Sequence, residues 1–366
     1  MSNYFIGIRY NLGRDAFQAA VLSFSGNEFT FIAKHTFPLP ESTLLAIDEL
    51  TIQGFLDYAT VYGLDTLFTE HLCHVIKELL NCANLTPQQV SAIGYSEDVS
   101  DHINHPEFSQ LGDPTAISMR TGIFTFAHSR SQQLRKKEIH QLPEQLFLQQ
   151  FLRSTQCTRC ILSVNQLSNL TMLSADASRG YVSLDVGPGF ALLDTWSLHH
   201  LGLLRDQNLR WTLTGTGIPT LIDEMLKDPY FLAPMPKFIH PSYFNLNWLN
   251  YYLSQQPFRN IHANVQRSLL ELTAKTITSA LARVIPMNTE IIIMGKAATN
   301  AGLIHCLQKN LSNTRRKQFV TEFPHAEWLE PAAMAWFAFR TLQQIQSNAH
   351  PDIADDRYHS EQPDAL

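Results

Sequence analysis

Two clusters in the sequence have residue types and a spacing that could support chemistry. Cys157 and Cys160 form a CxxC pair, a spacing found in zinc sites and in thiol redox centres. The chain has no second CxxC and no ligand histidine at zinc-finger spacing, and its five cysteines are an odd number. We therefore expect no metal site and no redox role for this pair.

The second cluster is a short basic run, formed by Arg130, Arg135, Lys136 and Lys137. Short runs of like charge are usually solvated faces. The whole chain carries a formal net charge of -6, whereas phosphate backbones select basic surfaces. The sequence therefore predicts no nucleic-acid partner.

Composition places the chain among ordinary globular proteins. It has 366 residues, 45% of them hydrophobic and 16% charged, and this length suggests two domains or two lobes. Nowhere do about 18 apolar residues follow one another, and the first residues lack a basic segment before an apolar one. We expect a cytoplasmic protein that does not associate with membranes.

Two similar series of strands and helices must position any site. Period-2 apolar patterns and turn residues predict two groups of three strands, at 4–9, 17–24 and 29–37 and at 160–164, 167–173 and 181–184. Later patterns predict buried strands at 91–95 and 291–294, and helices at 265–280 and 330–345. Each group thus continues from strands into alternating helix and strand.

This repeated order is the pattern of the actin-like sugar kinases, whose nucleotide lies between two lobes. We predict an α/β fold of two lobes, each a mixed sheet flanked by helices, with a ligand in the cleft. The expected N-terminal lobe spans 1–125 and the expected C-terminal lobe spans 126–347. Residues 348–366 are polar and are expected to form a flexible tail.

Several blocks of residues, spread in order along the chain, carry a family resemblance. They include Leu111-Gly112-Asp113, Arg120-Thr121-Gly122-Ile123, Gly187-Pro188-Gly189, Asp228-Pro229-Tyr230-Phe231 and Glu271-Leu272-Thr273-Ala274. Together they resemble the anhydro-N-acetylmuramic acid kinases of bacterial peptidoglycan recycling, over about residues 4–345. The resemblance implies a homodimer that uses MgATP to phosphorylate a cell-wall amino sugar while water opens its 1,6-anhydro ring.

The resemblance also assigns site residues to positions of this chain. It implies a nucleotide side made of Asp15, Asp185, Gly187, Gly189, Gly295 and Asn300, and a substrate side made of Lys237 and Glu330. It places His128 at the position of the family's catalytic aspartate, with Arg130 close by. Histidine is a conceivable general base because its ordinary pKa lies near working pH. A rim histidine with no proton to accept is the alternative.

The same motifs depart from the family pattern where the chemistry would take place. The opening phosphate loop, MSGTSxDG in the family, reads RYNLGRDA over residues 9–16 and keeps only Asp15. Two glycines of the family's NIGGIANLT segment are replaced by Asn165 and Gln166, and a GHGQT loop now contains Glu97 and Asp98. Phosphates bind backbone N–H groups that only small residues leave accessible, and carboxylates repel them.

From these departures we predict a diverged homologue that is inactive as a kinase, has a binding or regulatory role and needs no cofactor. Two alternatives remain open. One is an active kinase that phosphorylates 1,6-anhydro-N-acetylmuramic acid with MgATP, and the other is a different enzyme in the same cleft. The expected partner is a cell-wall amino sugar or another small molecule.

Overall fold

The computed structural model describes residues 4–11, 15–53, 57–100, 110–129, 142–202, 206, 209–255, 261–320 and 322–349. Of these, residues 51–53, 241, 296, 317 and 349 are described by their backbone alone. Arg130, the rest of the basic run and most of the expected tail lie outside the described residues.

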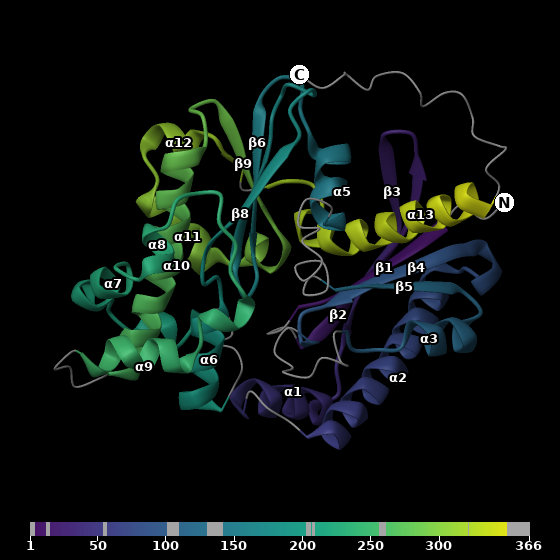
Figure 1. Ribbon diagram of the computed structural model, residues 1–366, viewed down its shortest axis with the longest axis horizontal. Coiled ribbons are helices and arrows are strands. Elements are labelled where there is room, and N and C mark those ends of the chain that lie inside the picture. Colours follow the sequence, from purple (N-terminus) through teal and green to yellow (C-terminus); the bar gives the residue numbers. More distant parts are fainter. Residues whose placement is uncertain are drawn as a thin grey trace.

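The first sheet has five strands in the order β3-β2-β1-β4-β5 (Figure 1). The first three strands form an antiparallel meander, as predicted, and β4 and β5 continue parallel to β1. Helix α2 on the outer face is capped at its N-terminus by Asp57, whose side chain accepts a hydrogen bond from the Thr60 N–H, and at its C-terminus by Asn84 in the left-handed conformation. The elements of this part are β1 (Tyr4–Tyr10), β2 (Ala16–Ser25), β3 (Glu28–Pro38), α1 (Glu41–Gln53), α2 (Tyr58–Ala83), β4 (Val90–Glu97), α3 (Pro114–Thr121) and β5 (Phe124–His128).

The second sheet repeats this design in the order β10-β9-β6-β7-β8. Strands β6, β7 and β8 form the second antiparallel meander, and β9 and β10 run parallel to β6. The strands are β6 (Thr158–Val164), β7 (Ser168–Leu173), β8 (Tyr181–Gly187), β9 (Thr289–Met294) and β10 (Phe319–Val320). The helices of its outer face and the subdomain beside it are α6 (Ala191–Leu201), α7 (Pro219–Met225), α8 (Pro229–Leu232), α9 (Leu246–Ser254), α10 (His262–Val284), α11 (Ala301–Asn310) and α12 (Asn313–Lys317).

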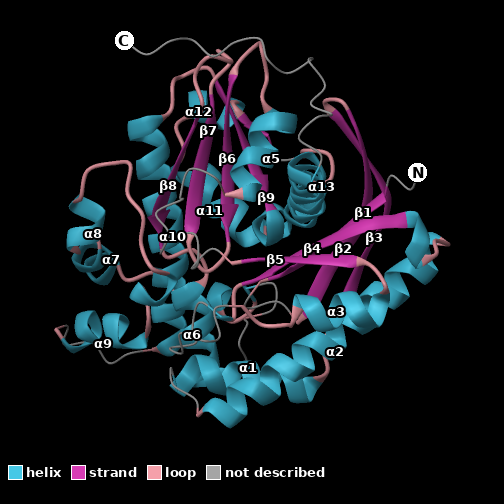
Figure 2. Cartoon of the chain, turned by 45° about the vertical axis from the view of Figure 1, so that its right-hand side comes forward, coloured by secondary structure: helices cyan, strands magenta, loops and turns pink. Residues whose placement is uncertain are grey.

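Helices α5 (Pro143–Leu152) and α13 (Leu329–Ala349) lie between the two sheets (Figure 2). One hydrophobic cluster joins residues of both sheets to these helices, including Phe5 and Ala92 of the first sheet and Ile161 of the second. Helix α13 lies directly on β1 and β4 because Gly7 and Gly94 have no side chains, and a Cβ at either position would overlap the α13 backbone. The inner face of the first sheet is therefore covered by a helix that comes much later in the chain.

Two lobes, each a mixed five-stranded sheet with helices, confirm the predicted fold class. The apolar patterns placed most strands within a residue or two of their observed ends. The closing helix is longer than the predicted 330–345, since α13 continues to Ala349. Helix α5 was not predicted, although it supplies part of the layer between the sheets.

Candidate functional site

Three turns from the two sheets meet at the carboxylate of Glu330. Asn11 follows β1, Asn165 follows β6 and Gly295 follows β9, and all three strands end at the cleft. The Asn11 side-chain amide donates to one carboxylate oxygen at 2.6 Å, and the Asn165 amide donates to the other at 2.7 Å. Glu330 is 0% exposed, in the first turn of α13, where the helix dipole stabilises a negative charge. One buried carboxylate thus links the two lobes.

Gly295 completes this arrangement. Its φ is +69°, a conformation that side chains rarely adopt, and a Cβ would lie 2.9 Å from a carboxylate oxygen of Glu330. The structure therefore brings together two residues, Gly295 and Glu330, that the resemblance assigned to opposite sides of the site. It also brings in Asn11 and Asn165, which stand where the resemblance expects glycines.

The turn after β8 packs against the turn that contains Asn165. The buried Asp185 carboxylate accepts hydrogen bonds from the Asn169 amide and the Ile239 backbone N–H, each at 3.1 Å. A side chain at Gly187 would meet Thr276 of α10, and one at Gly189 would meet the backbone of the Asn165 turn. These glycines therefore allow close packing between segments of the second lobe.

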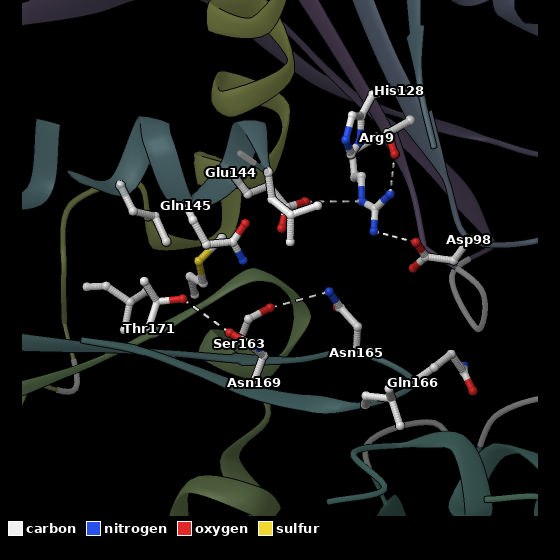
Figure 3. Close-up of a pocket in the computed structure, with 16 residues that line it drawn as sticks. Arg9, Asp98, His128, Glu144, Gln145, Ser163, Asn165, Gln166, Asn169 and Thr171 are labelled. Carbon is white, nitrogen blue, oxygen red and sulfur yellow. Dashed lines mark hydrogen bonds and ion pairs between the residues drawn. The ribbon is translucent and has the colours of Figure 1, made fainter. Parts of the chain in front are cut away.

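A charged pocket lies beside Glu330, at the ends of β1, β4, β5 and β6 (Figure 3). The guanidinium of Arg9 donates to the Ser96 hydroxyl at 2.8 Å and to Asp98 at 2.5 Å. Its Nε is 4.0 Å from a carboxylate oxygen of Glu144 on α5. Figure 3 shows the guanidinium between these two carboxylates, opposite a wall of neutral side chains from the second sheet.

The carboxylates decide the charge state of Arg9, which is only 7% exposed. Burial by itself lowers the pKa of this guanidinium, but the negative charges of Asp98, Glu144 and Glu330 outweigh burial and raise the pKa. Arg9 therefore remains a cation inside the protein. A lone buried charge would be costly, so the carboxylates of the segment after β4, of α5 and of α13 are what allow an arginine on a central strand.

The pocket is small for a whole ligand. Its volume is about 70 Å³, whereas pockets for drug-sized molecules typically have about 300–1,000 Å³. The space suits a few water molecules or one edge of a sugar.

His128 is the predicted catalytic residue that lines this pocket. It ends β5, is 8% exposed, and packs its ring at 69° to the Phe337 ring, with 5.6 Å between centroids. Its role as a base stays a prediction. Arg130, the second predicted catalytic residue, lies outside the described residues.

The other predicted site residues lie away from the pocket lining. Asn300 begins α11, where its side chain accepts from the Leu303 N–H at 2.9 Å. Lys237 donates to the Tyr230 carbonyl and lies 4.2 Å from that residue's ring centroid, and burial lowers the pKa of this lysine. Asp15 is exposed at the start of β2. Nucleotide or substrate contacts of these three residues remain predictions.

Sequence reasoning missed Arg9 and Glu144 as site residues. One signal was available: Arg9 interrupts the apolar run of β1, and a charged residue on a buried strand needs a partner. The partners themselves could not be identified, because Ser96, Asp98 and Glu144 lie 87 to 135 residues further along the chain.

Comparison with known proteins identifies the family of the chain. The two lobes and the pocket at the ends of parallel strands define a protein with the two-lobed fold of the sugar kinases. The family profile described as "Anhydro-N-acetylmuramic acid kinase" matches residues 3–357. The chain therefore belongs to the anhydro-N-acetylmuramic acid kinase family.

Individual relatives match over almost their whole length. A Shewanella pealeana protein named anhydro-N-acetylmuramic acid kinase is 29% identical over 351 residues, covering 95% of this chain and 94% of the relative. A Coxiella burnetii protein of the same name is 30% identical over 352 residues, covering 94% and 92%. These names favour an active kinase over the inactive homologue that the sequence predicted.

Solved structures are more distant. The activator of 2-hydroxyisocaproyl-CoA dehydratase from Clostridium difficile has a TM-score of 0.43 at 11% identity, covering 94% of this chain and 97% of that one. A ROK family glucokinase from Streptomyces griseus has a TM-score of 0.40 at 11% identity, covering 92% and 99%. Likeness at this level carries no functional argument.

Two further observations apply only to the described part of the chain. None of its helices is long and apolar enough to cross a membrane. Within the same residues, no three histidine, cysteine, aspartate or glutamate side chains gather in a group that could hold a metal ion.

Proposed function

We propose that this protein binds a small amino sugar in the cleft between its sheets and does not transfer phosphate from MgATP to it. The observation that supports this proposal is the pair of side-chain amides, those of Asn11 and Asn165, that the turns after β1 and β6 direct to the buried carboxylate of Glu330. The resemblance expects phosphate-binding glycines at these two turns.

The residues at this meeting point do not fit the phosphates of a nucleotide. The amide groups of Asn11 and Asn165, which could otherwise donate to a phosphate, already donate to Glu330. We therefore derive no catalytic step through MgATP.

The comparisons favour a second candidate, ATP-dependent phosphorylation of 1,6-anhydro-N-acetylmuramic acid with opening of its ring. Relatives with this name match along nearly the whole chain. The pocket also contains the carboxylates of Asp98 and Glu144, a residue type that can accept a proton from an attacking water. Identity near 30% establishes the family, whereas the side chains at the turns decide the chemistry.

One experiment separates the two candidates. The purified protein is incubated with MgATP and 1,6-anhydro-N-acetylmuramic acid, ADP release is recorded, and the sugar is examined by mass spectrometry. The Shewanella pealeana relative is the positive control. Calorimetry with the sugar alone tests binding. Sugar binding without phosphorylated product supports the first candidate, and turnover within about tenfold of the control supports the second.

The variant His128→Asp makes this test sharper, because it restores the carboxylate that the resemblance expects. A general base contributes about 10²- to 10⁴-fold to a rate. We expect no recovery of turnover, since phosphoryl transfer depends mainly on positioning and electrostatic stabilisation of the phosphate, and Asn11 and Asn165 still replace the glycines of the phosphate-binding turns. Phosphorylated sugar formed by this variant but not by the unmodified protein would show that the phosphate site is intact.

We also propose an oligomeric state and a cellular location for the protein. The family resemblance supports a homodimer in the cytoplasm. Analytical ultracentrifugation of the full chain at micromolar concentration tests the dimer: a species of twice the chain mass is expected, and a monomer throughout would contradict it.

A further inference from the structure

A second and larger pocket lies outside the cleft. Its volume is about 640 Å³, within the range of about 300–1,000 Å³ that is typical of small-molecule sites. It is lined by the turn between β2 and β3 and by α5 and α13, which lie side by side between the sheets (Figure 1). None of the described residues that line the pocket beside Glu330 also lines this one. The two pockets are therefore separate sites.

The spacing of the lining residues explains how two helices make this pocket. Residues at positions i, i+3, i+4 and i+7 of a helix share one face. Gln145 and Leu148, which line the pocket beside Glu330, lie on a different face of α5, so this helix is a wall of both pockets. The second pocket is lined by two sets with the i, i+3, i+4 and i+7 spacing, one that ends directly after α5 and one on α13: Leu146, Gln149, Gln150 and Arg153, and Phe337, Arg340, Thr341 and Gln344.

The charged side chains of this lining are both arginines. Arg153 donates to three backbone carbonyls of the turn before β8, at 3.0, 2.9 and 3.3 Å. The guanidinium carbon of Arg340 lies 5.6 Å from the centroid of the Trp336 ring, in a cation–π contact that leaves its N–H donors available. None of the described residues that line the pocket is acidic. The lining thus has two positive charges and no negative charge.

These two arginines differ from Arg9 in the cleft. Arg9 is buried and pairs with Asp98, whereas neither Arg153 nor Arg340 forms an ion pair with another described residue. Arg340 is exposed and Arg153 is half-buried, so a ligand from solvent can reach both side chains. A guanidinium without a carboxylate partner binds carboxylates and phosphates through its planar set of N–H donors. The charges of the pocket therefore favour an anion.

The rest of the lining is largely apolar or amide. Pro143 and Leu146 of α5 and Trp336 and Phe337 of α13 supply apolar and aromatic surface. Small-molecule sites typically combine such surface with a few polar groups that fix the orientation of the ligand. A ligand that fits has a flat apolar body as well as its anionic group. The amide side chains, each able to donate and to accept hydrogen bonds, are Asn27, Gln149, Gln150 and Gln344.

We propose that this pocket is a second ligand site, which binds a small aromatic anion: a carboxylate or phosphate carried on a flat apolar ring. The anionic group binds Arg153 and Arg340, and the ring packs against the apolar side chains of α5 and α13. The site lies outside the cleft to which the proposed function refers, so its ligand can bind whether or not the cleft binds a sugar.

Calorimetry with matched ligands at pH 7 tests the proposal. Indole-3-acetate is compared with indole-3-acetamide, which has the same ring and no charge, and 1-naphthyl phosphate is compared with 1-naphthol. Inorganic phosphate supplies charge without a ring. We expect at least one aromatic anion to bind at least tenfold more tightly than its neutral counterpart and than inorganic phosphate. The pair with the larger preference identifies carboxylate or phosphate as the preferred group.

Two results would overturn the proposal. Equal binding of anion and neutral counterpart in both pairs would show that the arginines do not select a charge. Inorganic phosphate that binds as tightly as the aromatic anions would show that the ring contributes nothing.

Variants connect the preference with the arginines. Arg340→Gln removes one charge from the pocket and should reduce the preference for the aromatic anion about three- to tenfold. Arg120→Gln, which removes an exposed arginine on α3 outside the pocket, is the matched control and should keep the full preference. An unchanged preference in Arg340→Gln would also overturn the proposal.

Arg153→Gln is a second test of the same kind, with the same expected loss of preference. Because Arg153 also holds three backbone carbonyls, the fold of this variant is first checked by circular dichroism. Arg340 makes no hydrogen bond to another described residue, so Arg340→Gln decides the question if Arg153→Gln does not fold.

Discussion

Replacing Glu330 by alanine tests the link between the lobes. The change removes the acceptor of two amide groups, and a buried donor without a partner costs about 1–3 kcal/mol. Asn11 is 1% exposed and should incur the upper part of this range. Asn165 is half-buried and has the Ser163 hydroxyl oxygen 3.4 Å away, so its share is smaller. We expect Glu330→Ala to lower the free energy of unfolding by about 2–4 kcal/mol.

Urea unfolding at 25 °C, followed by circular dichroism, measures this change. The control is Glu322→Ala, an exposed glutamate shortly before α13, which should stay within about 0.5 kcal/mol of the unmodified protein. Asn11→Ala is measured alone and combined with Glu330→Ala. The loss of unfolding free energy in the double variant should differ from the sum of the two single losses by at least about 0.5 kcal/mol, because the two side chains share one hydrogen bond. A Glu330→Ala protein as stable as the control would refute the view that this carboxylate joins the lobes.

Three other changes have expected outcomes. Gly295→Ala puts an alanine at a φ of +69° and places its Cβ 2.9 Å from Glu330. The control is Gly26→Ala, where φ is +56° and no atom lies within 4 Å of the new Cβ. The melting temperature of the protein should fall further in Gly295→Ala than in Gly26→Ala. Asp228→Ala leaves two tyrosine hydroxyls and a tryptophan N–H without their shared acceptor. It should lower the free energy of unfolding by about 2–4 kcal/mol in urea titrations, and an unchanged urea midpoint would contradict this. Burial, and after it two neighbouring histidines, lower the pKa of His200 from 6.5 to about 4. The contribution of the neutral ring to the free energy of unfolding is therefore complete above pH 6.5 and is lost as the pH falls toward 4. Unfolding curves of His200→Phe should therefore depend less on pH in that window, and an identical pH profile would show that His200 does not carry the effect.

The fold could be predicted to a large extent because its signals are local. The turn at Gly26 and the apolar runs beside it predicted the first meander, and hydrogen-bonded neighbours in a meander follow one another along the chain. Helix α5 was harder to predict because it has only ten residues, of which Pro143 is the first, and comes directly after a polar stretch of the sequence. Its place between the sheets depends on apolar partners from other segments.

The site was predictable only where the resemblance marked it. Glu330 and Gly295 were singled out as family positions, but their contact depends on how two distant segments pack. Asn165 lies 165 residues from Glu330 in the chain, and no local pattern predicts that its amide reaches this carboxylate. The substitutions at the turns were visible in the sequence, whereas their consequence, a carboxylate held between two amides, required the packed structure.

The position of α13 has a consequence for how the chain is made on the ribosome. Synthesis proceeds from the N-terminus, so β1, β2 and β4 are complete about 230 residues before α13 begins. Until then the face that carries Phe5, Leu22 and Ala92 lacks the helix that covers it in the finished protein. Incomplete chains that expose apolar surface tend to aggregate, so we expect this sheet to need protection during translation. The first lobe therefore acquires its final packing only after the second lobe has been synthesised.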